Sequence, residues 1–494
     1  MNLISNLNHS TYRALALAGV LLVSNACMVG PKYQRPTATA PAAYKEPPPT
    51  GWKEAQPSDG VIRGRWWEIY NDPQLNALEE QVSISNQNVR LAEAQFREAK
   101  AAVRIARSAL FPTVSAAPSI ISTRTPSQVT GSVQGGAKVT PHGFYSLPID
   151  ASYTADLWGS IRRSIAASTA NAQVSAADLE NAKLTFQAEL ASDYFQLHGL
   201  DGDAALLADA VKSYAEFLQL TRNRYAGGVA SLGDVAQAET QLETTRGQLV
   251  DVGVQRAQFE HAIAILIGKP PSEFSIPAAA ITTLPPAIPI GVPSALLERR
   301  PDIAANERQV AAANEQIGIA KAAFYPTLTL SASAGLESAD FLKWLTWPSR
   351  FWSVGPQLAE TLFDAGKRHA QVAQAEAAYD ATVDTYRQTV LTALQQVEDN
   401  LSALRILAEE AEVTGRAVKA ARQSLDISTD QYKGGIVAYL QVITAQTAWL
   451  SEQRVAVDLL TRRMTASVSL IEALGGGWDA SQLPKPADIM AANR

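Results

Sequence analysis

Two pairs of adjacent glycines interrupt segments that otherwise contain no strong helix breaker. Gly227-Gly228 lies within Arg224-Tyr-Ala-Gly-Gly-Val-Ala-Ser-Leu-Gly-Asp234, and Gly434-Gly435 lies within Asp430-Gln-Tyr-Lys-Gly-Gly-Ile-Val-Ala-Tyr-Leu-Gln441. Each pair sits in a run of more than about a hundred residues without proline, which is rare outside long helices. Each pair also follows a tyrosine by one intervening residue and precedes a new helical pattern. The sequence therefore predicts two very long helical hairpins with the glycine pairs at their tips.

The beginning of the chain has the features of a targeting segment. Arg13 precedes an apolar run from Ala14 to Val23 that is too short to span a bilayer as a helix. We therefore expect residues 1–26 to be a signal peptide. No later segment of the sequence resembles a transmembrane helix, so a membrane could be spanned only with strands.

Cys27 is the only cysteine, so no internal disulfide can form. We expect it to be the lipid-modified first residue of a mature bacterial lipoprotein, anchored by its acyl chains. Ser24 stands where such sequences usually have leucine, which leaves open a free thiol beside a cleavage site. Met28, rather than aspartate, favours passage to the outer membrane. Residues 27–72, rich in proline and alanine, are expected to form an extended strap.

The rest of the chain is duplicated. Ala106–Val114 matches Ala320–Leu328, and each segment ends in an aromatic residue, Pro-Thr and an aliphatic residue. Gly159 is matched by Gly366, and the two glycine pairs keep the same spacing of about two hundred residues. This pattern predicts repeats over residues 73–292 and 293–478, followed by a tail over residues 479–494.

Each repeat is predicted to contain a helix, two strands and one long helical hairpin. In the first repeat, a helix over about residues 88–110 precedes an irregular strand over about residues 113–122. A polar loop then leads to a strand over residues 145–154 that has one apolar and one polar face. The second repeat alternates in the same way over residues 327–334 and 352–359.

The helices are too long for a globular core. The helix from Gly159 to Tyr225 would be about 100 Å long, at about 1.5 Å per residue. Apolar residues in its counterpart recur at steps that average close to 3.5, which is coiled-coil spacing: Val383, Tyr386, Val390, Leu394, Val397, Leu401 and Leu404. Periodicity alone leaves open a pair of free-standing coiled-coil hairpins.

The strands argue for an assembly of several chains. A sheet of four strands has open edges, which a membrane does not tolerate, and the smallest closed membrane barrels have about eight strands. The strands therefore form either a soluble sandwich or one barrel pooled from several chains. Aromatic residues near the second pair of strands are typical of an interfacial belt, although in a soluble protein such residues more often belong to a core or an interface: Phe341, Trp344, Trp347, Phe351 and Trp352. The signal peptide, the expected lipid anchor and the alternating strands together favour the barrel.

The chain resembles the TolC-like outer-membrane factors, most closely their OprM and NodT lipoprotein branch. The match follows the family's order over the whole mature chain, and Arg-Pro-Asp-Ile is its most specific motif. The stretches that carry it are Met28-Val-Gly-Pro-Lys-Tyr33, Trp66-Trp67, Asp72-Pro73, Leu296-Leu-Glu-Arg-Arg-Pro-Asp-Ile303, Ile317-Gly-Ile-Ala320, Phe324-Tyr-Pro-Thr-Leu328 and Leu474-Gly-Gly-Gly-Trp478.

The resemblance implies a mainly α fold with membrane β-strands. Three identical chains, with four strands each, would form a twelve-stranded outer-membrane β-barrel that continues as a long periplasmic α-helical barrel. The implied function is the exit duct of a tripartite efflux system in a Gram-negative bacterium. The implied partners are a periplasmic adaptor (membrane fusion protein), an inner-membrane transporter of RND type and outer-membrane lipid.

Residues suited to catalysis form no recognisable site. The five histidines match no metal-ligand spacing, and the sequence has neither a Gly-rich phosphate loop nor a nucleophile elbow. Lysine and arginine are scattered in a chain of net charge −6, which indicates no nucleic-acid partner. We expect a protein that is not an enzyme and that uses no cofactor or metal.

The expected functional residues lie in the strands and at the helical tips. Polar strand positions should face a lumen, since a lipid-facing aspartate is costly: Asp150, Ser152, Thr154, Ser353 and Gln357. Docking of the adaptor is expected at the two tips: Gly227, Gly228, Val229, Ser231, Asp234, Gly434, Gly435 and Ile436. Asp234, near Arg222 and Arg224, could form interhelical ion pairs, or these charges could be solvated.

The resemblance to the lipoprotein branch places the periplasmic gate at Tyr439, Leu440 and Thr444. Leu440 fits the apolar ring that constricts the mouth, and Thr444 replaces an acidic residue of the family. The second tip is therefore the expected gating hairpin, and the first is the expected outer docking surface. The rival function is a non-channel periplasmic coiled-coil lipoprotein that acts as an adaptor or spacer. Two hairpins and strands of membrane type argue against it.

Overall fold

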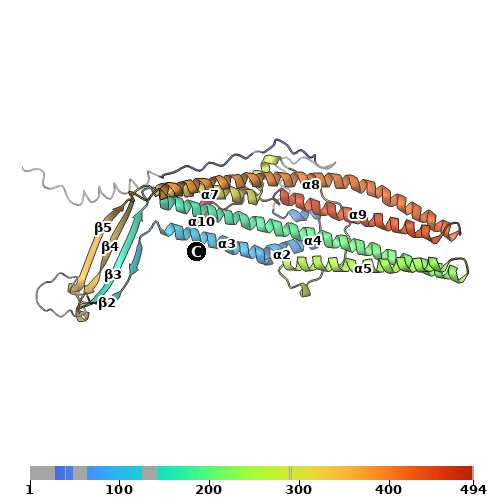
Figure 1. The fold of residues 1–494 in the computed structure, drawn as a ribbon, viewed down its shortest axis with the longest axis horizontal. Helices are drawn as coiled ribbons and strands as arrows, with labels where there is room; N and C mark the ends of the chain where they lie inside the picture. The colour runs from blue at the N-terminus through green and yellow to red at the C-terminus, as the bar shows by residue number, and fades with distance from the viewer. Residues whose placement is uncertain are drawn as a thin grey trace, which may run out of the picture.

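The molecule is a long rod with a β-sheet at one end and two helical tips at the other (Figure 1). The computed structural model describes residues 28–38, 40–47, 64–124, 142–288, 290 and 292–491. The expected signal peptide, Cys27 and part of the strap lie outside these residues. Long helices run the length of the rod between the sheet and the tips.

The helices of the two repeats match in length. Helices α3 and α7 have 22 residues each, α4 and α8 have 67 each, and α5 and α9 have 35 each. The predicted duplication is therefore confirmed. Their bounds are Gln87–Ser108 (α3), Ser160–Ala226 (α4), Leu232–Leu266 (α5), Pro301–Ala322 (α7), Lys367–Lys433 (α8) and Tyr439–Ala473 (α9). Shorter helices are Pro73–Ser85 (α2), Leu296–Arg299 (α6) and Pro486–Met490 (α10).

The sheet has four strand positions, all antiparallel. Strand β3 (His142–Ala155) pairs with β4 (Thr327–Ser338), which pairs with β5 (Arg350–Ala359). On its other side β3 pairs with two short strands, β1 (Thr113–Ala116) and β2 (Ser119–Thr123). The irregular strand predicted from the sequence is thus broken at residues 117–118. Pro118 has no backbone N–H to donate to a ladder.

Helix α4 lies at the centre of the helical part. It packs against α3 and α7 toward the sheet, and against α5 and α9 toward the tips. Helix α8 packs against α7 and α9, and the predicted seam along it is buried. Leu394 is the exception, because it is only partly buried while Ala393 is fully buried.

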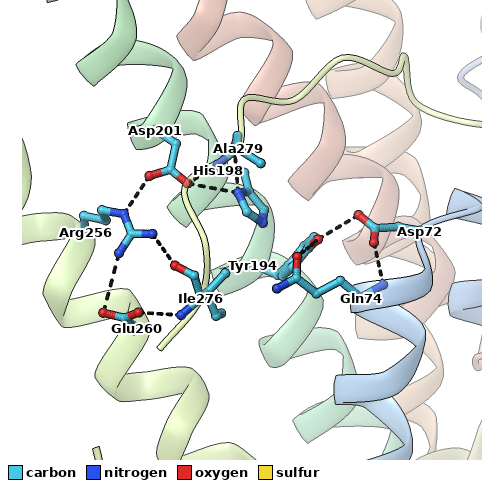
Figure 2. Close-up of polar contacts among 9 residues, drawn as sticks. All are labelled: Asp72, Gln74, Tyr194, His198, Asp201, Arg256, Glu260, Ile276 and Ala279. Carbon is cyan, nitrogen blue, oxygen red and sulfur yellow. Dashed lines mark hydrogen bonds and ion pairs between the residues drawn. The ribbon is translucent and has the colours of Figure 1, made fainter. Parts of the chain in front are cut away.

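A Pro-rich connection between the repeats is fastened to the helices by polar contacts (Figure 2). Asp201 of α4 accepts hydrogen bonds from Arg256 Nε at 2.6 Å and from the Ala279 backbone N–H at 3.0 Å. Arg256 also donates to the Ile276 carbonyl at 2.7 Å, and Glu260 accepts from the Ile276 N–H at 2.6 Å. Three backbone groups of an extended segment are thereby satisfied by charged side chains.

His198 lies in the same group. Its Nδ1 is 2.7 Å from the Ala279 carbonyl oxygen and 3.0 Å from Asp201 Oδ2. Its ring stands edge-on to Tyr194, whose hydroxyl donates to Asp72 at 2.7 Å (Figure 2). Asp72 in turn caps the start of α2, accepting from the backbone N–H groups of Gln74 and Leu75. The contacts therefore join α2, α4 and the connection at mid-height of the rod.

Arg300 explains the Arg-Pro-Asp-Ile motif. Its guanidinium forms a bidentate pair with Asp302, at 3.0 and 2.7 Å. It also donates to the Gln396 side chain of α8 at 2.8 Å and to the carbonyl of Ala473, the last residue of α9, at 3.0 Å. One side chain thus joins the start of α7 to α8 and to the C-terminal end of α9, where a cation is favoured.

The described part of the strap runs along the outside of the helices. The Val29 N–H donates to the Trp158 carbonyl at 3.1 Å, beside the junction of β3 and α4. Tyr33 donates to Glu307 of α7. Further along, Glu398 of α8 accepts from the backbone N–H groups of Lys45 and Glu46, at 2.7 and 2.9 Å. The strap is held by these hydrogen bonds and by Tyr33, Ala38 and Tyr44, which pack against the hydrophobic core.

Glu79 of α2 is an ionisable group enclosed in the core. It is 0% exposed, and neither carboxylate oxygen has a hydrogen-bond partner among the described residues. Burial raises the pKa of Glu79 well above its usual value of 4.5. The folded protein therefore holds a proton on Glu79 that the unfolded chain loses above about pH 4.5.

We predict that Glu79→Gln raises the free energy of unfolding relative to the wild type, increasingly so as the pH rises above 4.5. Each pKa unit of upward shift costs the wild type about 1.4 kcal/mol once the unfolded carboxyl is ionised. Denaturant unfolding of both proteins at about pH 5 and pH 8 measures the difference. Glu98→Gln, on the exposed face of α3, is the matched control and should show no such trend. A constant difference across this range would contradict the prediction.

Candidate functional site

The sheet has one polar face, and all five strand residues predicted to face a lumen lie on it. Asp150 is opposite Ser333, which is opposite Ser353 on β5. In the same way Thr154, Thr329 and Gln357 form one row. Ser152 lies between these rows, opposite Ser331. Polar residues from strands that are far apart in the sequence are therefore aligned on one face of the sheet.

The opposite face is apolar and uncovered. Rows such as Ile149, Ala334 and Trp352 cross it from strand to strand. Its large residues are exposed in the single chain: Ile149 55%, Leu330 41%, Trp352 76%, Val354 72% and Leu358 67%. An exposed apolar surface of this kind indicates contact with lipid or protein. One side of β1 and β2, and one side of β5, have no partner strand among the described residues.

The aromatic residues near the second pair of strands divide into two groups. Phe341 and Trp344 pack on Tyr145, with ring centroids 5.4 and 5.7 Å apart. Trp347 and Trp352 are each 76% exposed. The first group closes the end of the sheet, and the second is free to contact a lipid interface.

The two helical tips have the same backbone. In each, the second glycine of the pair has φ of 76°, a left-handed conformation that favours glycine. The backbone N–H groups of Val229 and Ile436, which follow, bond back to the carbonyls of Arg224 and Gln431, at 2.8 and 2.9 Å. Val229 and Ile436 are 68% and 76% exposed, so each tip presents an apolar side chain at its end.

The first tip corrects one prediction. Asp234 forms no interhelical ion pair with the residues that the structure describes; its carboxylate accepts from the Ser231 N–H at 3.0 Å, and Ser231 Oγ accepts from the Asp234 N–H at 3.1 Å. This is a capping box that starts α5. Arg222 instead pairs weakly with Glu239, at 3.4 Å.

Arg224 joins the two hairpins. It donates to the Tyr432 carbonyl at 3.2 Å, and its guanidinium lies 4.6 Å from the centre of the Tyr432 ring. The sequence did not predict this contact, although both residues lie in the stretches that flank the glycine pairs. An arginine face against an aromatic ring is a favourable pairing.

The predicted gate residues fall in two different environments. Tyr439 is only 1% exposed and packs against Tyr432 and Phe217, with ring centroids 5.4 and 6.3 Å apart. It therefore fixes the two hairpins to each other and is not on the surface of the tip. Leu440 is 55% exposed. Thr444 is exposed, and its hydroxyl donates to the Leu440 carbonyl at 2.9 Å.

Two features are absent from the described residues. None of their helices combines the length and the hydrophobicity needed to cross a bilayer. No group of three or more His, Cys, Asp or Glu side chains in the described ranges is arranged to hold a metal ion.

Comparisons with known proteins agree with this architecture. The family model "Outer membrane efflux protein" matches residues 78–269 and 292–476. The probable efflux pump outer membrane protein TtgC of Pseudomonas putida is 29% identical over 470 residues, covering 95% of this chain and 96% of its own. The probable outer membrane lipoprotein SilC of Salmonella typhimurium is 24% identical, covering 94% of this chain and 99% of its own.

Solved structures share the fold. The outer-membrane channel OprN superposes with a TM-score of 0.82 and 29% identity, covering 92% of this chain and 100% of that one. The CmeC outer membrane channel of Campylobacter jejuni has a TM-score of 0.85 at 23% identity. The predicted fold class, mainly α with membrane β, is thereby confirmed. The chain belongs to the outer membrane efflux protein family, and it is a channel that forms the outer-membrane exit of an efflux system rather than an enzyme.

Proposed function

We propose that three copies of this chain form the complete duct. The observation that carries the proposal is the sheet: four strand positions, one polar face, one exposed apolar face and two open edges. Twelve strands joined edge to edge leave no unpaired backbone in lipid. The polar face, with Asp150, Ser152, Thr154, Ser353 and Gln357, then lines the lumen. The helices continue it as a tunnel through the periplasm.

The partners that fit this duct are a periplasmic adaptor and an inner-membrane transporter of RND type. Adaptor contact is assigned to the two tips, where Val229 and Ile436 are exposed beside the glycine pairs. The first tip, with its capped α5, is the outer docking surface. The second tip is the gating hairpin, and Leu440 is its exposed apolar residue next to Thr444.

The proposal includes a lipid anchor on Cys27. The described chain begins at Met28, and a side chain on Gly159, at the start of α4, would lie 2.8 Å from the Met28 side chain. Met28, the residue that follows Cys27 in the sequence, thus lies beside the point where the sheet meets the helices. Acyl chains on Cys27 would enter the periplasmic leaflet of the outer membrane at this level.

We predict that Leu440→Ala increases the conductance of the purified protein in planar bilayers severalfold, because an apolar constriction loses its side chains. Leu232→Ala is the matched control: Leu232 is also exposed, at 63%, in the first turn of α5 on the other tip. It should leave the conductance unchanged. Equal effects of the two variants would remove Leu440 from the gate, and a wild type and Leu440→Ala variant that both fail to conduct would refute the duct.

We predict that the mature protein incorporates labelled palmitate and that Cys27→Ala abolishes the incorporation. Mass spectrometry of the N-terminal peptide measures the acyl chains directly. Insertion and trimer formation of Cys27→Ala should persist, because the strands provide the main membrane contact. A wild-type peptide with a free Cys27 thiol would refute the anchor while leaving the duct intact.

A further inference from the structure

The sheet meets the helices in a single plane. At the end of the sheet nearest the helices, Ala155 of β3 pairs with Leu328 of β4, and Thr327 of β4 pairs with Ala359 of β5. Helices α3 and α7 end here, and α4 and α8 begin here (Figure 1). We call the residues of these four connections, with the adjoining helix ends, the junction: residues 104–112, 156–162, 321–326 and 360–368.

Several large apolar side chains of the junction are exposed. Leu362 and Phe363, between β5 and α8, are 91% and 86% exposed, and Phe111, before β1, is 61% exposed. The connection between β3 and α4 has a large apolar ring that is partly buried: Trp158 stacks on Tyr325 at 4.7 Å and donates to the Pro326 carbonyl at 2.8 Å. The exposed pair therefore lies in the longer connection, residues 360–366, whereas the connection in the first repeat spans only residues 156–159.

Cations at the junction also form two groups. Arg162 and Arg368 are paired with Asp156 and Asp364, at 3.0 and 2.7 Å. In each repeat the same aspartate also accepts backbone N–H groups at the start of a long helix, so these pairs are structural. Lys321 is paired with Glu376 at 2.9 Å.

Three other cations have no such partner. Arg104, Arg107 and Lys367 are exposed, and none forms an ion pair with the described residues. Glu360 is the one exposed carboxylate of the junction that likewise lacks an ion pair among them. Arg107 is one helical turn before Phe111, and Lys367 follows Phe363 by four residues. Unpaired positive charge therefore lies beside exposed apolar side chains at both edges of the sheet.

We infer that the junction binds the headgroup of an anionic phospholipid in the periplasmic leaflet of the outer membrane. Arg107, Lys367 and Arg104 contact the phosphate, and Leu362, Phe363 and Phe111 enter the acyl region beneath it. The inference rests on the proposed trimer, because joining the sheets edge to edge brings Arg107 of one copy next to Lys367 of the next. A free phosphate ion would gain nothing from the apolar side chains, whereas a lipid uses both.

The test uses the full-length protein in nanodiscs made from equal amounts of phosphatidylethanolamine and phosphatidylglycerol. Native mass spectrometry of the released trimer counts the lipids that stay bound. We expect phosphatidylglycerol to be enriched, and the enrichment to fall with ionic strength. Arg107→Gln and Lys367→Gln should each lower it about fivefold. Arg97→Gln is the matched control, since Arg97 is exposed and unpaired on the same helix but about 15 Å farther from the sheet.

Several results would overturn the inference. These are no enrichment in a conducting wild-type trimer, equal losses for Arg97→Gln and Arg107→Gln, and displacement of the lipid by millimolar inorganic phosphate. The double change Leu362→Ser and Phe363→Ser should also reduce the enrichment of phosphatidylglycerol. If this variant instead dissociates the trimer, and the fraction that remains trimeric keeps its lipid, then Leu362 and Phe363 form a contact between subunits and do not bind lipid. A wild type that neither forms trimers nor conducts would refute the proposed duct itself, so the two failures are distinguishable.

Discussion

Unpaired backbone along the two edges of the sheet is the constraint on which the rest of the molecule depends. One chain supplies four strand positions, and the outer sides of β1, β2 and β5 find no partner among its described residues. Lipid offers those N–H and C=O groups no hydrogen bonds, so the sheet is complete only when copies join. The helices have the same need, since exposed apolar residues such as Val250 of α5 and Val413 of α8 would otherwise face water.

The two repeats share the same helices and tips, and several of the residues to which we assign functions lie where the repeats differ. The paired helices agree in length to the residue, and both tips turn through a glycine at the same φ. The residues and connections of the two repeats nevertheless differ at several places. Ser231 caps α5 while Ala438 provides no side-chain cap for α9. Trp158 is partly buried while Phe363 is exposed. The first repeat alone is followed by a long connection held by Asp201 and Arg256.

Much of the fold could be predicted because its signals are local and appear twice. Glycine pairs, alternating strands and coiled-coil spacing each depend on neighbouring residues, so the hairpins and strands followed from them. The Ser231–Asp234 capping box was also readable from its spacing, whereas the ion pair considered as one alternative for Asp234 is not formed among the described residues. Burial of Tyr439 was not readable, because it depends on Phe217 of the other hairpin, which is far away in the sequence, as well as on the nearby Tyr432. The contacts of His198 and Asp201 depend likewise on the path of a loop.

Arg300 has a mechanical consequence. It fastens the end of α9 to α7 and α8 at one level of the rod. From that level α9 runs 35 residues to its tip, about 50 Å at about 1.5 Å per residue. If α9 tilted by about 5° about the Arg300 contact, its far end would move by about 4 Å. A small adjustment at mid-height would thus be amplified to the width of a side chain at the tip.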